Sequence, residues 1–214
     1  MKKPITLLFV LLLVSGSLWS QLSGTYTVGS GGNYATIAAA IDALNTSGVV
    51  APGVTFNVLA GHTESATTTL TITATGTSTA PIVIQMSGTG ANPLITRMDA
   101  GTISTSSLSA DGDAIIKLSG TDYITFNGID LTANNQGIEY GYYTFKPSGT
   151  DGCQYVTIKN STVTMTKGTS AYVIGIYISN GPTSPSAVTG VTVTSTSGIN
   201  SNIVISGNTI TNVH

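Results

Sequence analysis

Two aspartates stand two positions apart in the segment SADGDAIIKLSG, residues 109–120. Asp111 and Asp113 precede an apolar run, and at this spacing their carboxylate oxygens could share one calcium ion in a loop. The alternative is a solvated turn in which each aspartate bonds to its own backbone. The sequence therefore offers Asp111 and Asp113 as a candidate Ca²⁺ site, and it indicates no other metal and no cofactor.

The densest aromatic segment is EYGYYTF, residues 139–145, which contains Tyr140, Tyr142 and Tyr143. Aromatic rings with a polar tip can stack against the face of a sugar or anchor a protein contact. The alternative is that this strand and its loop pack against neighbouring parts of the fold. We take Tyr140, Tyr142 and Tyr143 as the candidate carbohydrate-binding residues.

The remaining titratable residues form no pattern that predicts catalysis. His62 lies near Glu64 in LAGHTES, but no second histidine stands at metal-ligand spacing, so a loop histidine is expected. Cys153 has no histidine nearby in the sequence and is expected to be a small buried residue. Asp122, in GTDYITFNG, directly precedes a repeated pattern that begins at Tyr123 and is described below, so the geometry of that pattern explains it. No catalytic residue is predicted.

The first 20 residues have the pattern of a signal peptide. Lys2 and Lys3 precede an apolar run of about ten residues from Ile5 to Val14, and small and polar residues follow. A membrane-spanning helix needs about 20 apolar residues, so an uncleaved anchor is the weaker alternative. We expect cleavage before the mature chain, which would then be extracellular or on the outer cell surface and would not bind a membrane.

The composition favours an exported β protein. Charged residues make up 7% of the chain, against about 25% in ordinary soluble domains. The chain is instead rich in threonine, serine, glycine and asparagine. It has no stripe of basic residues of the kind that binds the phosphates of a nucleic acid. A single cysteine excludes an internal disulfide within these residues.

The region from residue 21 to residue 52 contains a short strand and the one good helical pattern. Thr36 is a plausible N-cap, apolar residues recur from Ile37 to Leu44 with helical spacing, and Gly48 stands where a helix would end. One face of this helix is apolar. We expect it to cap the open end of a stack of strands and to hide the first backbone edge.

Residues 53–214 contain internal repeats. YITFNGIDLT, YVTIKNSTVT and NIVISGNTIT, which begin at residues 123, 155 and 202, align with apolar residues at the second and fourth places. The sixth place holds Gly128, Asn160 and Gly207, residue types that accept a positive φ at low cost. Each repeat is therefore predicted to bend there, as at the corner of a β-solenoid. A β-sandwich is the alternative, and a further strand is expected around residues 191–194.

With these repeats and the helix before them, the chain resembles the pectin lyase-like superfamily of right-handed parallel β-helices. The segment VGSGGNYATIAAAIDAL, residues 28–44, is similar to the start of pectinesterases and several polysaccharide lyases. The chain looks closest to large secreted or surface β-helix proteins exported by the type IX route. The resemblance implies an all-β, right-handed parallel β-helix with a short N-terminal capping α-helix. We expect the coils of residues 53–214 to be C-terminally incomplete, as in an N-terminal fragment.

We expect a secreted or cell-surface module for adhesion or carbohydrate binding, whose partner is a polysaccharide or another surface protein. One alternative is a polysaccharide lyase or carbohydrate esterase with its active site outside this segment, and another is a structural stalk. An enzyme requires acids and bases that converge on one groove. Asp111, Asp113, Asp122 and Lys117 within about 6 Å of one another would favour catalysis, and scattered side chains would favour binding.

Overall fold

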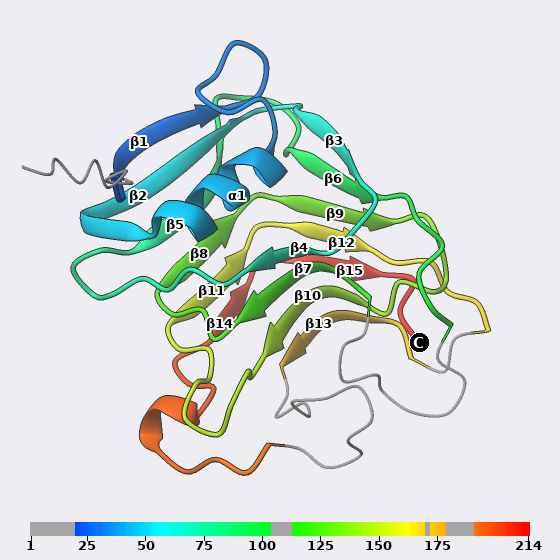
Figure 1. Cartoon of the computed structure of the whole chain (residues 1–214). Helices are drawn as coiled ribbons and strands as arrows, with labels where there is room; N and C mark the ends of the chain where they lie inside the picture. The colour runs from blue at the N-terminus through cyan, green and yellow to red at the C-terminus, as the bar shows by residue number, and fades with distance from the viewer. Residues whose placement is uncertain (1–19, 104–112, 170–171, 179–190) are drawn as a thin grey trace, which may run out of the picture.

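The computed structural model describes residues 20–103, 113–169, 172–178 and 191–214. Asp111 and almost all of the predicted signal peptide, residues 1–19, lie outside these ranges. The described chain is mostly β, with one α-helix and three parallel sheets (Figure 1).

The strands fall into three sheets, in each of which all neighbours are parallel. Sheet A contains, in order, β1 (Leu22–Val28), β2 (Val49–Leu59), β5 (Ile82–Ser87), β8 (Ile124–Asn127), β11 (Val156–Lys159) and β14 (Val204–Ser206). Sheet B contains β3 (Thr63–Ala66), β6 (Leu94–Arg97), β9 (Asp130–Ala133), β12 (Thr162–Thr164) and β15 (Thr209–Thr211). Sheet C contains β4 (Leu70–Ile72), β7 (Ala114–Ser119), β10 (Tyr140–Phe145) and β13 (Ile174–Ile178).

From β2 onward the chain visits the three sheets in turn. It runs through sheets A, B and C as β2–β3–β4, and it repeats this order until it reaches β14 and β15. Each new strand pairs with the strand of the same sheet one turn earlier, so the colours of Figure 1 progress along the stack. This arrangement is compatible with an all-β parallel solenoid.

The core consists of columns of apolar side chains that run along the stack. In sheet A, Phe56, Ile84, Phe126 and Ile158 are register partners in successive strands, and each is buried. Ile95, Leu131 and Val163 form the equivalent column in sheet B. Because side chains along a strand alternate between its two faces, every second residue points into this interior. Burial of these apolar side chains is the main contribution to the stability of the fold.

A left-handed residue lies at each bend that the repeats predict. The φ angles of Gly128, Asn160 and Gly207 are 68°, 56° and 63°. Polar side chains then connect successive turns at this corner between sheets A and B. The Asn160 side-chain amide donates to Asn127 Oδ1 over 2.8 Å, and the Asn92 amide donates to Asp130 Oδ1 over the same distance. These bonds pair the polar side chains of one turn with those of the next.

The helix α1 (Ile37–Ser47) has the predicted caps. Thr36 accepts a hydrogen bond from the backbone N–H of Ala39, and Gly48 ends the helix with a φ of 69°. The buried face, which includes Ile41 and Leu44, belongs to the main core, and α1 contacts β1, β2 and β4 at the N-terminal end of the stack (Figure 1). The apolar face of α1 thus covers the N-terminal end of the stack.

The strand expected around residues 191–194 does not form, which corrects that prediction. These residues have no regular structure and lead into a 3₁₀ turn, η1 (Thr196–Gly198). The backbone N–H of Thr194 donates to the carbonyl of Gly149 over 2.8 Å. Alternating valine and threonine residues predict a strand from propensity alone, whereas here the segment pairs with a loop and no sheet edge receives it.

Candidate functional site

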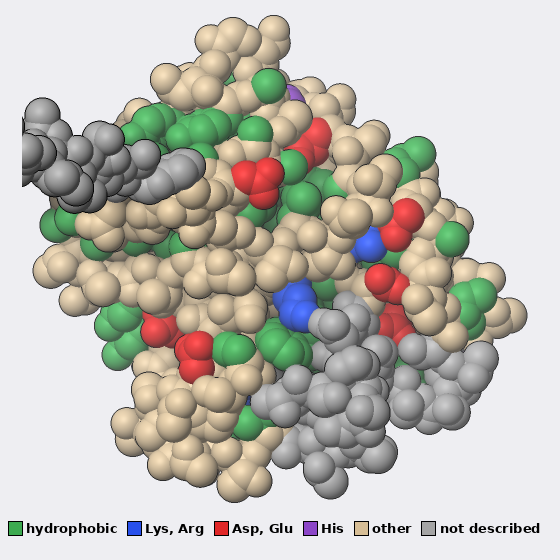
Figure 2. Space-filling view, viewed as in Figure 1, with side chains coloured by type: hydrophobic (Ala, Val, Ile, Leu, Met, Phe, Trp, Pro, Cys, Tyr) green, Lys and Arg blue, Asp and Glu red, His purple; other side chains and the backbone are tan. Residues whose placement is uncertain are grey.

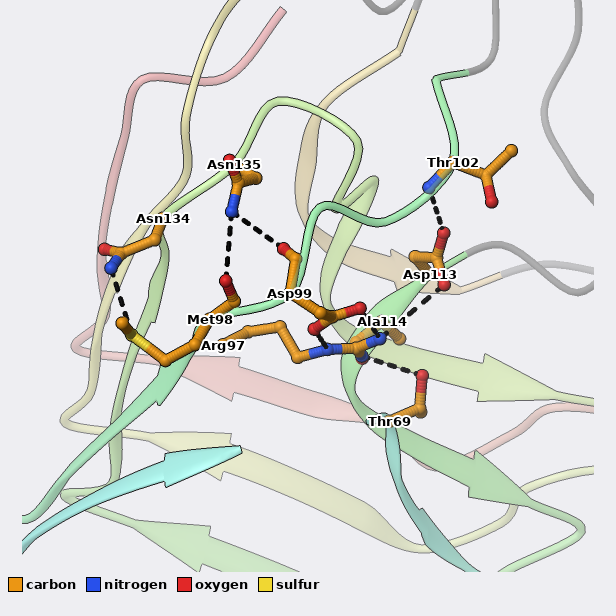
Figure 3. A network of polar contacts seen from close by, with 9 residues as sticks. All are labelled: Thr69, Arg97, Met98, Asp99, Thr102, Asp113, Ala114, Asn134 and Asn135. Carbon is orange, nitrogen blue, oxygen red and sulfur yellow. Dashed lines mark hydrogen bonds and ion pairs between the residues drawn. The ribbon is translucent and has the colours of Figure 1, made fainter. Parts of the chain in front are cut away.

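Asp113 lies beside Arg97, whose guanidinium group is almost completely buried. Arg97 Nη2 lies 3.6 Å from Asp113 Oδ1 and 2.9 Å from Asp99 Oδ2, while Nη1 donates to Thr69 Oγ1 over 2.9 Å (Figure 3). Arg97 also donates to the carbonyl of Ala114. The arginine side chain therefore joins two carboxylates to the starts of two sheet C strands, β4 and β7.

Further hydrogen bonds connect this network to the next turn of the chain. The side-chain amide of Asn135 donates to the carbonyls of Met98 and Asp99, over 3.1 and 2.8 Å, and the backbone N–H of Thr102 donates to Asp113 over 2.5 Å (Figure 3). The bond from Arg97 lowers the pKa of Asp99 below its ordinary value. The network stabilises the corner between sheets B and C.

These contacts give the Asp113 carboxylate a cationic partner within the chain. Within the described ranges, no group of three or more His, Cys, Asp or Glu side chains is placed to hold a metal ion. Asp111, the other half of the predicted calcium site, lies outside the described residues. The Ca²⁺ site therefore stays a prediction.

The three tyrosines predicted to bind carbohydrate are buried. The Tyr142 ring lies in the main core beside Phe126, with centroids 5.1 Å apart, and its hydroxyl donates to the carbonyl of Ile129 over 2.9 Å. Burial raises the pKa of this hydroxyl. Tyr142 is thus a core residue whose polar tip has an internal partner.

Tyr140 and Tyr143 belong to a second apolar cluster, on the other face of sheet C. Their ring centroids lie 4.8 Å apart, and Tyr177 stacks on Tyr140 at 4.8 Å with an interplanar angle of 10°. The Lys117 ammonium group lies 4.0 Å from the centroid of Phe145, which flanks the cluster. In this conformation the rings of Tyr140 and Tyr143 are packed against protein and offer no open face to a sugar.

His62 and Cys153 have structural surroundings. His62 Nε2 lies 3.1 Å from Glu64 Oε2, and the Glu64 carboxylate accepts the backbone N–H groups of Ile37 and Ala38 at the start of α1. Cys153 is buried, and its thiol donates to the carbonyl of Leu118 over 3.4 Å. Burial raises the pKa of this thiol to about 12, so it is not a reactive thiolate at neutral pH.

Two of the acids considered for catalysis, Asp113 and Asp122, do not converge on one groove. Asp113 immediately precedes β7 and Asp122 follows its end, so the six-residue strand separates them, a length of about 20 Å. Asp122 lies at the corner between sheets C and A, where it accepts a hydrogen bond from the backbone N–H of Gln154 over 2.7 Å. The convergence that would favour catalysis is absent for this pair.

The most distinctive surface feature is a pair of stacked tyrosines at the corner before sheet A. The rings of Tyr123 and Tyr155 are 4.3 Å apart, centroid to centroid, with an interplanar angle of 12°. Tyr155 is 44% exposed and Tyr123 is partly exposed. They occupy the same register position in adjacent turns, one residue before β8 and β11, and Asn202 takes this position in the next turn.

The backbone at this position is unusual for tyrosine. The φ angles of Tyr123, Tyr155 and Asn202 are 49°, 55° and 54°, in the left-handed region. Asparagine enters this region easily, whereas a bulky residue there is uncommon and strained. The chain thus retains an aromatic ring at two positions where glycine or asparagine would cost less, which is a reason to consider a functional role for the pair.

Two carboxylate groups lie at this corner, since Asp122 directly precedes Tyr123 in the chain and Asp151 is close enough for its charge to act on Asp122. Burial raises the pKa of Asp122, and the charge of Asp151 adds to this effect. Burial also raises the pKa of Asp151. The pKa of Tyr123 is raised first by desolvation, then by its contact with Tyr155, and last by the charge of Asp122. The corner therefore combines exposed ring surface with acceptor oxygens, and we call Tyr123, Tyr155, Asp122 and Asp151 the tyrosine corner.

Sequence reasoning missed the tyrosine corner because it took the first residue of each repeat only as the start of the pattern. The available signal was that two of the three aligned repeats begin with tyrosine. Aromatic density directed attention instead to residues 139–145, where alternate rings fill the core.

Comparison with protein-family models, with curated proteins and with solved structures finds no significant match. The resemblance to the pectin lyase-like superfamily therefore rests on the residues quoted above. Within the described part of the chain, no helix has the length and apolar character needed to cross a membrane.

Proposed function

We propose that this chain is an exported module of right-handed parallel β-helix fold that binds carbohydrate through its tyrosine corner. The observation that carries the proposal is the stacked pair of Tyr155, which is exposed, and Tyr123, which is partly exposed, both in a strained backbone conformation. Such strain persists where the surroundings and function hold it in place.

The order of the strands supports the β-helix. Three parallel sheets visited in strict rotation, with left-handed residues at two corners of each repeat, are what a coil of stacked turns requires. The helix over the first strands agrees with the capping role that the resemblance implies. Export is supported by the N-terminal pattern and by the low content of charged residues.

The chemistry of the tyrosine corner suits a sugar. A pyranose has an apolar face of C–H groups that can lie against an aromatic ring, and hydroxyl groups that need acceptors at its edge. Tyr155 supplies exposed ring surface, and the carboxylates of Asp122 and Asp151 supply acceptors. A binding role is preferred to a lyase or esterase role because Asp113 and Asp122 lie at opposite ends of β7.

A glycan array tests this proposal. The protein would be purified from a host that exports it, with removal of the leader verified by mass spectrometry, and compared with Tyr123→Asn and Tyr155→Asn variants. Asparagine already occupies the equivalent left-handed position at residue 202, so the fold should tolerate both changes. We expect at least one glycan to bind the wild type, and each variant to bind it about tenfold or more weakly.

The matched control is Leu59→Asn, which changes an exposed apolar residue of sheet A outside the tyrosine corner. This control should bind as the wild type does. The proposal fails if no glycan is retained by the folded wild type. It also fails if the two tyrosine variants bind as tightly as the control.

A further inference from the structure

Asp122 connects the backbones of the two stacked tyrosines. It directly precedes Tyr123 in the chain, and its Oδ1 accepts the backbone N–H of Gln154, the residue before Tyr155, over 2.7 Å. One carboxylate therefore lies where both ring-bearing residues begin, in two successive turns of the stack. The backbone thus holds this carboxylate and the ring pair in a fixed arrangement.

Asp151 places a second carboxylate at the same corner. It lies against Gly120, two residues before Asp122, so closely that a side chain at position 120 would overlap the Asp151 carboxylate. Burial, and then the charge of Asp151, raise the pKa of Asp122. Two like charges at short range disfavour the ionised form of each other. The tyrosine corner therefore concentrates negative charge in a chain that carries little charge elsewhere.

These two carboxylates are not neutralised by a neighbouring side chain. Within the described part of the chain, neither Asp122 nor Asp151 forms an ion pair. Lys146, which is close to Asp151 in the sequence, is buried and donates to a backbone carbonyl of η1 over 2.7 Å. A positive group on a ligand would relieve the repulsion between the two carboxylates.

Tyr155 supplies ring surface beside this charge. It is 44% exposed, and Asn202 has its register position in the next turn, so the stack of rings ends at Tyr155. A cation within about 6 Å of an aromatic ring is attracted to the face of that ring. The apolar face of a sugar can lie against the same surface. The corner therefore suits a ligand that combines a sugar ring with a positive charge.

We infer that the tyrosine corner selects a glycan with protonated amino groups, such as a chain of glucosamine units. The inference rests on the carbohydrate binding proposed above and names the class of sugar. The pyranose ring lies on Tyr155, and its ammonium group faces the carboxylates of Asp122 and Asp151. Contacts of the ring and the hydroxyl groups supply most of the affinity, whereas the charge decides which sugar is preferred. A neutral N-acetylated unit has the same ring but leaves the repulsion between the carboxylates in place.

Calorimetric titration of the exported protein with two glucosamine oligosaccharides of equal length tests the inference. One is fully deacetylated and the other fully N-acetylated, at a pH where the free amino groups are protonated. We expect the deacetylated form to bind about tenfold or more tightly. Asp122→Asn and Asp151→Asn should each reduce this preference by about threefold or more, because each removes one charge.

The aspartate variants should keep the fold. Asparagine retains an acceptor oxygen, so Asp122→Asn can still accept the backbone N–H of Gln154, and circular dichroism should show the same spectrum as for the wild type. The matched control is Asp42→Asn, which removes an exposed carboxylate from α1, away from the corner. This control should keep the full preference for the deacetylated oligosaccharide.

The inference and the proposed function can fail separately. Equal binding of the two oligosaccharides, weakened in both cases by Tyr155→Asn, would overturn the amino-sugar inference and leave carbohydrate binding at the corner in place. A preference that both aspartate variants retain, or that Asp42→Asn reduces as much, would overturn the inference too, as would the absence of binding by either oligosaccharide. If Tyr155→Asn binds both as tightly as the wild type does, the proposed function fails and the inference fails with it.

Discussion

Arg97 illustrates how a single buried side chain organises one corner of the fold. It is 3% exposed and binds Asp99, Asp113 and Thr69, which come from three separate stretches of chain. The sequence alone could not predict this role, because Arg97 stands in no motif and its partners follow or precede it by different distances. The spacing of Asp111 and Asp113 alone suggested a metal site. The cationic partner of Asp113 in the structure is Arg97, which the spacing of the two aspartates could not indicate.

Replacing Arg97 with methionine should destabilise the protein by about 2–4 kcal/mol, because it removes a buried charge and its hydrogen bonds while keeping most of the volume. The effect should depend on pH. Arg97 lowers the pKa of Asp99, so the charged pair stabilises the folded state above the ordinary pKa of 3.8, and this contribution is lost as the pH falls through the lowered value. The difference between wild type and variant, measured by urea unfolding, should be largest near neutral pH and should shrink below about pH 4. An equal difference at all pH values would contradict this assignment.

Asn202 offers a test of the tyrosine corner by gain of binding. It has the register position and the left-handed backbone of Tyr123 and Tyr155, so Asn202→Tyr should extend the stack by one ring. If ring surface is what binds the glycan, affinity should rise about three- to tenfold, which corresponds to about 0.5–1.5 kcal/mol for one aromatic contact. Val204→Tyr, which adds a ring two residues later and outside the corner, should leave the affinity unchanged. Equal effects of the two changes would count against a specific corner.

At the scale of elements, α1 was the most predictable part of the chain. Thr36, the apolar spacing from Ile37 to Leu44 and Gly48 are local signals, and they gave both ends of the helix. The partner of its first turn was not predictable, because Glu64 comes from β3. The strand expected at residues 191–194 failed for a related reason, since a strand needs an edge to pair with and no local pattern reports one.

Glu64 should stabilise the start of α1. Its buried carboxylate accepts the N–H groups of Ile37 and Ala38, over 2.5 and 3.1 Å, where the helix dipole favours a negative charge. We expect Glu64→Gln to lower the free energy of unfolding by about 1 kcal/mol and Glu64→Ala to lower it by about 2–3 kcal/mol. Thermal denaturation would measure these losses. The control Asp42→Asn, which removes an exposed carboxylate from the same helix, should have little effect on the free energy of unfolding. Similar losses for Asp42→Asn and Glu64→Ala would show that Glu64 has no special role.

At the scale of the whole molecule, three aligned repeats were enough to predict a stack of parallel strands. The apolar places of the first two repeats became buried columns, and the glycine or asparagine at the sixth place of all three became a bend. The repeats show only the features that each turn of the stack has in common, namely buried apolar places and a bend. They do not show how many sheets the stack has or how long the connections between turns are, so these could not be predicted from the repeats.

The surface of the molecule agrees with the low content of charge. On the face shown in Figure 2, charged side chains are few, and uncharged polar side chains and backbone cover most of the surface. A ligand for such a surface has to be recognised by hydrogen bonds and ring contacts more than by net charge. A carbohydrate, which is rich in hydroxyl groups and uncharged in its common forms, is the kind of ligand that our proposal assigns to it.

The most direct test of the carbohydrate-binding account is to locate the ligand. Nuclear magnetic resonance spectra of the exported protein, labelled on its tyrosine rings, would be recorded during titration with an oligosaccharide that the array identifies. Binding at the tyrosine corner should produce saturable shifts of the ring signals of Tyr123 and Tyr155 and leave the signals of the buried Tyr142 unchanged. Saturable shifts confined to other tyrosines, or no shift of Tyr123 and Tyr155 at saturation, would contradict it.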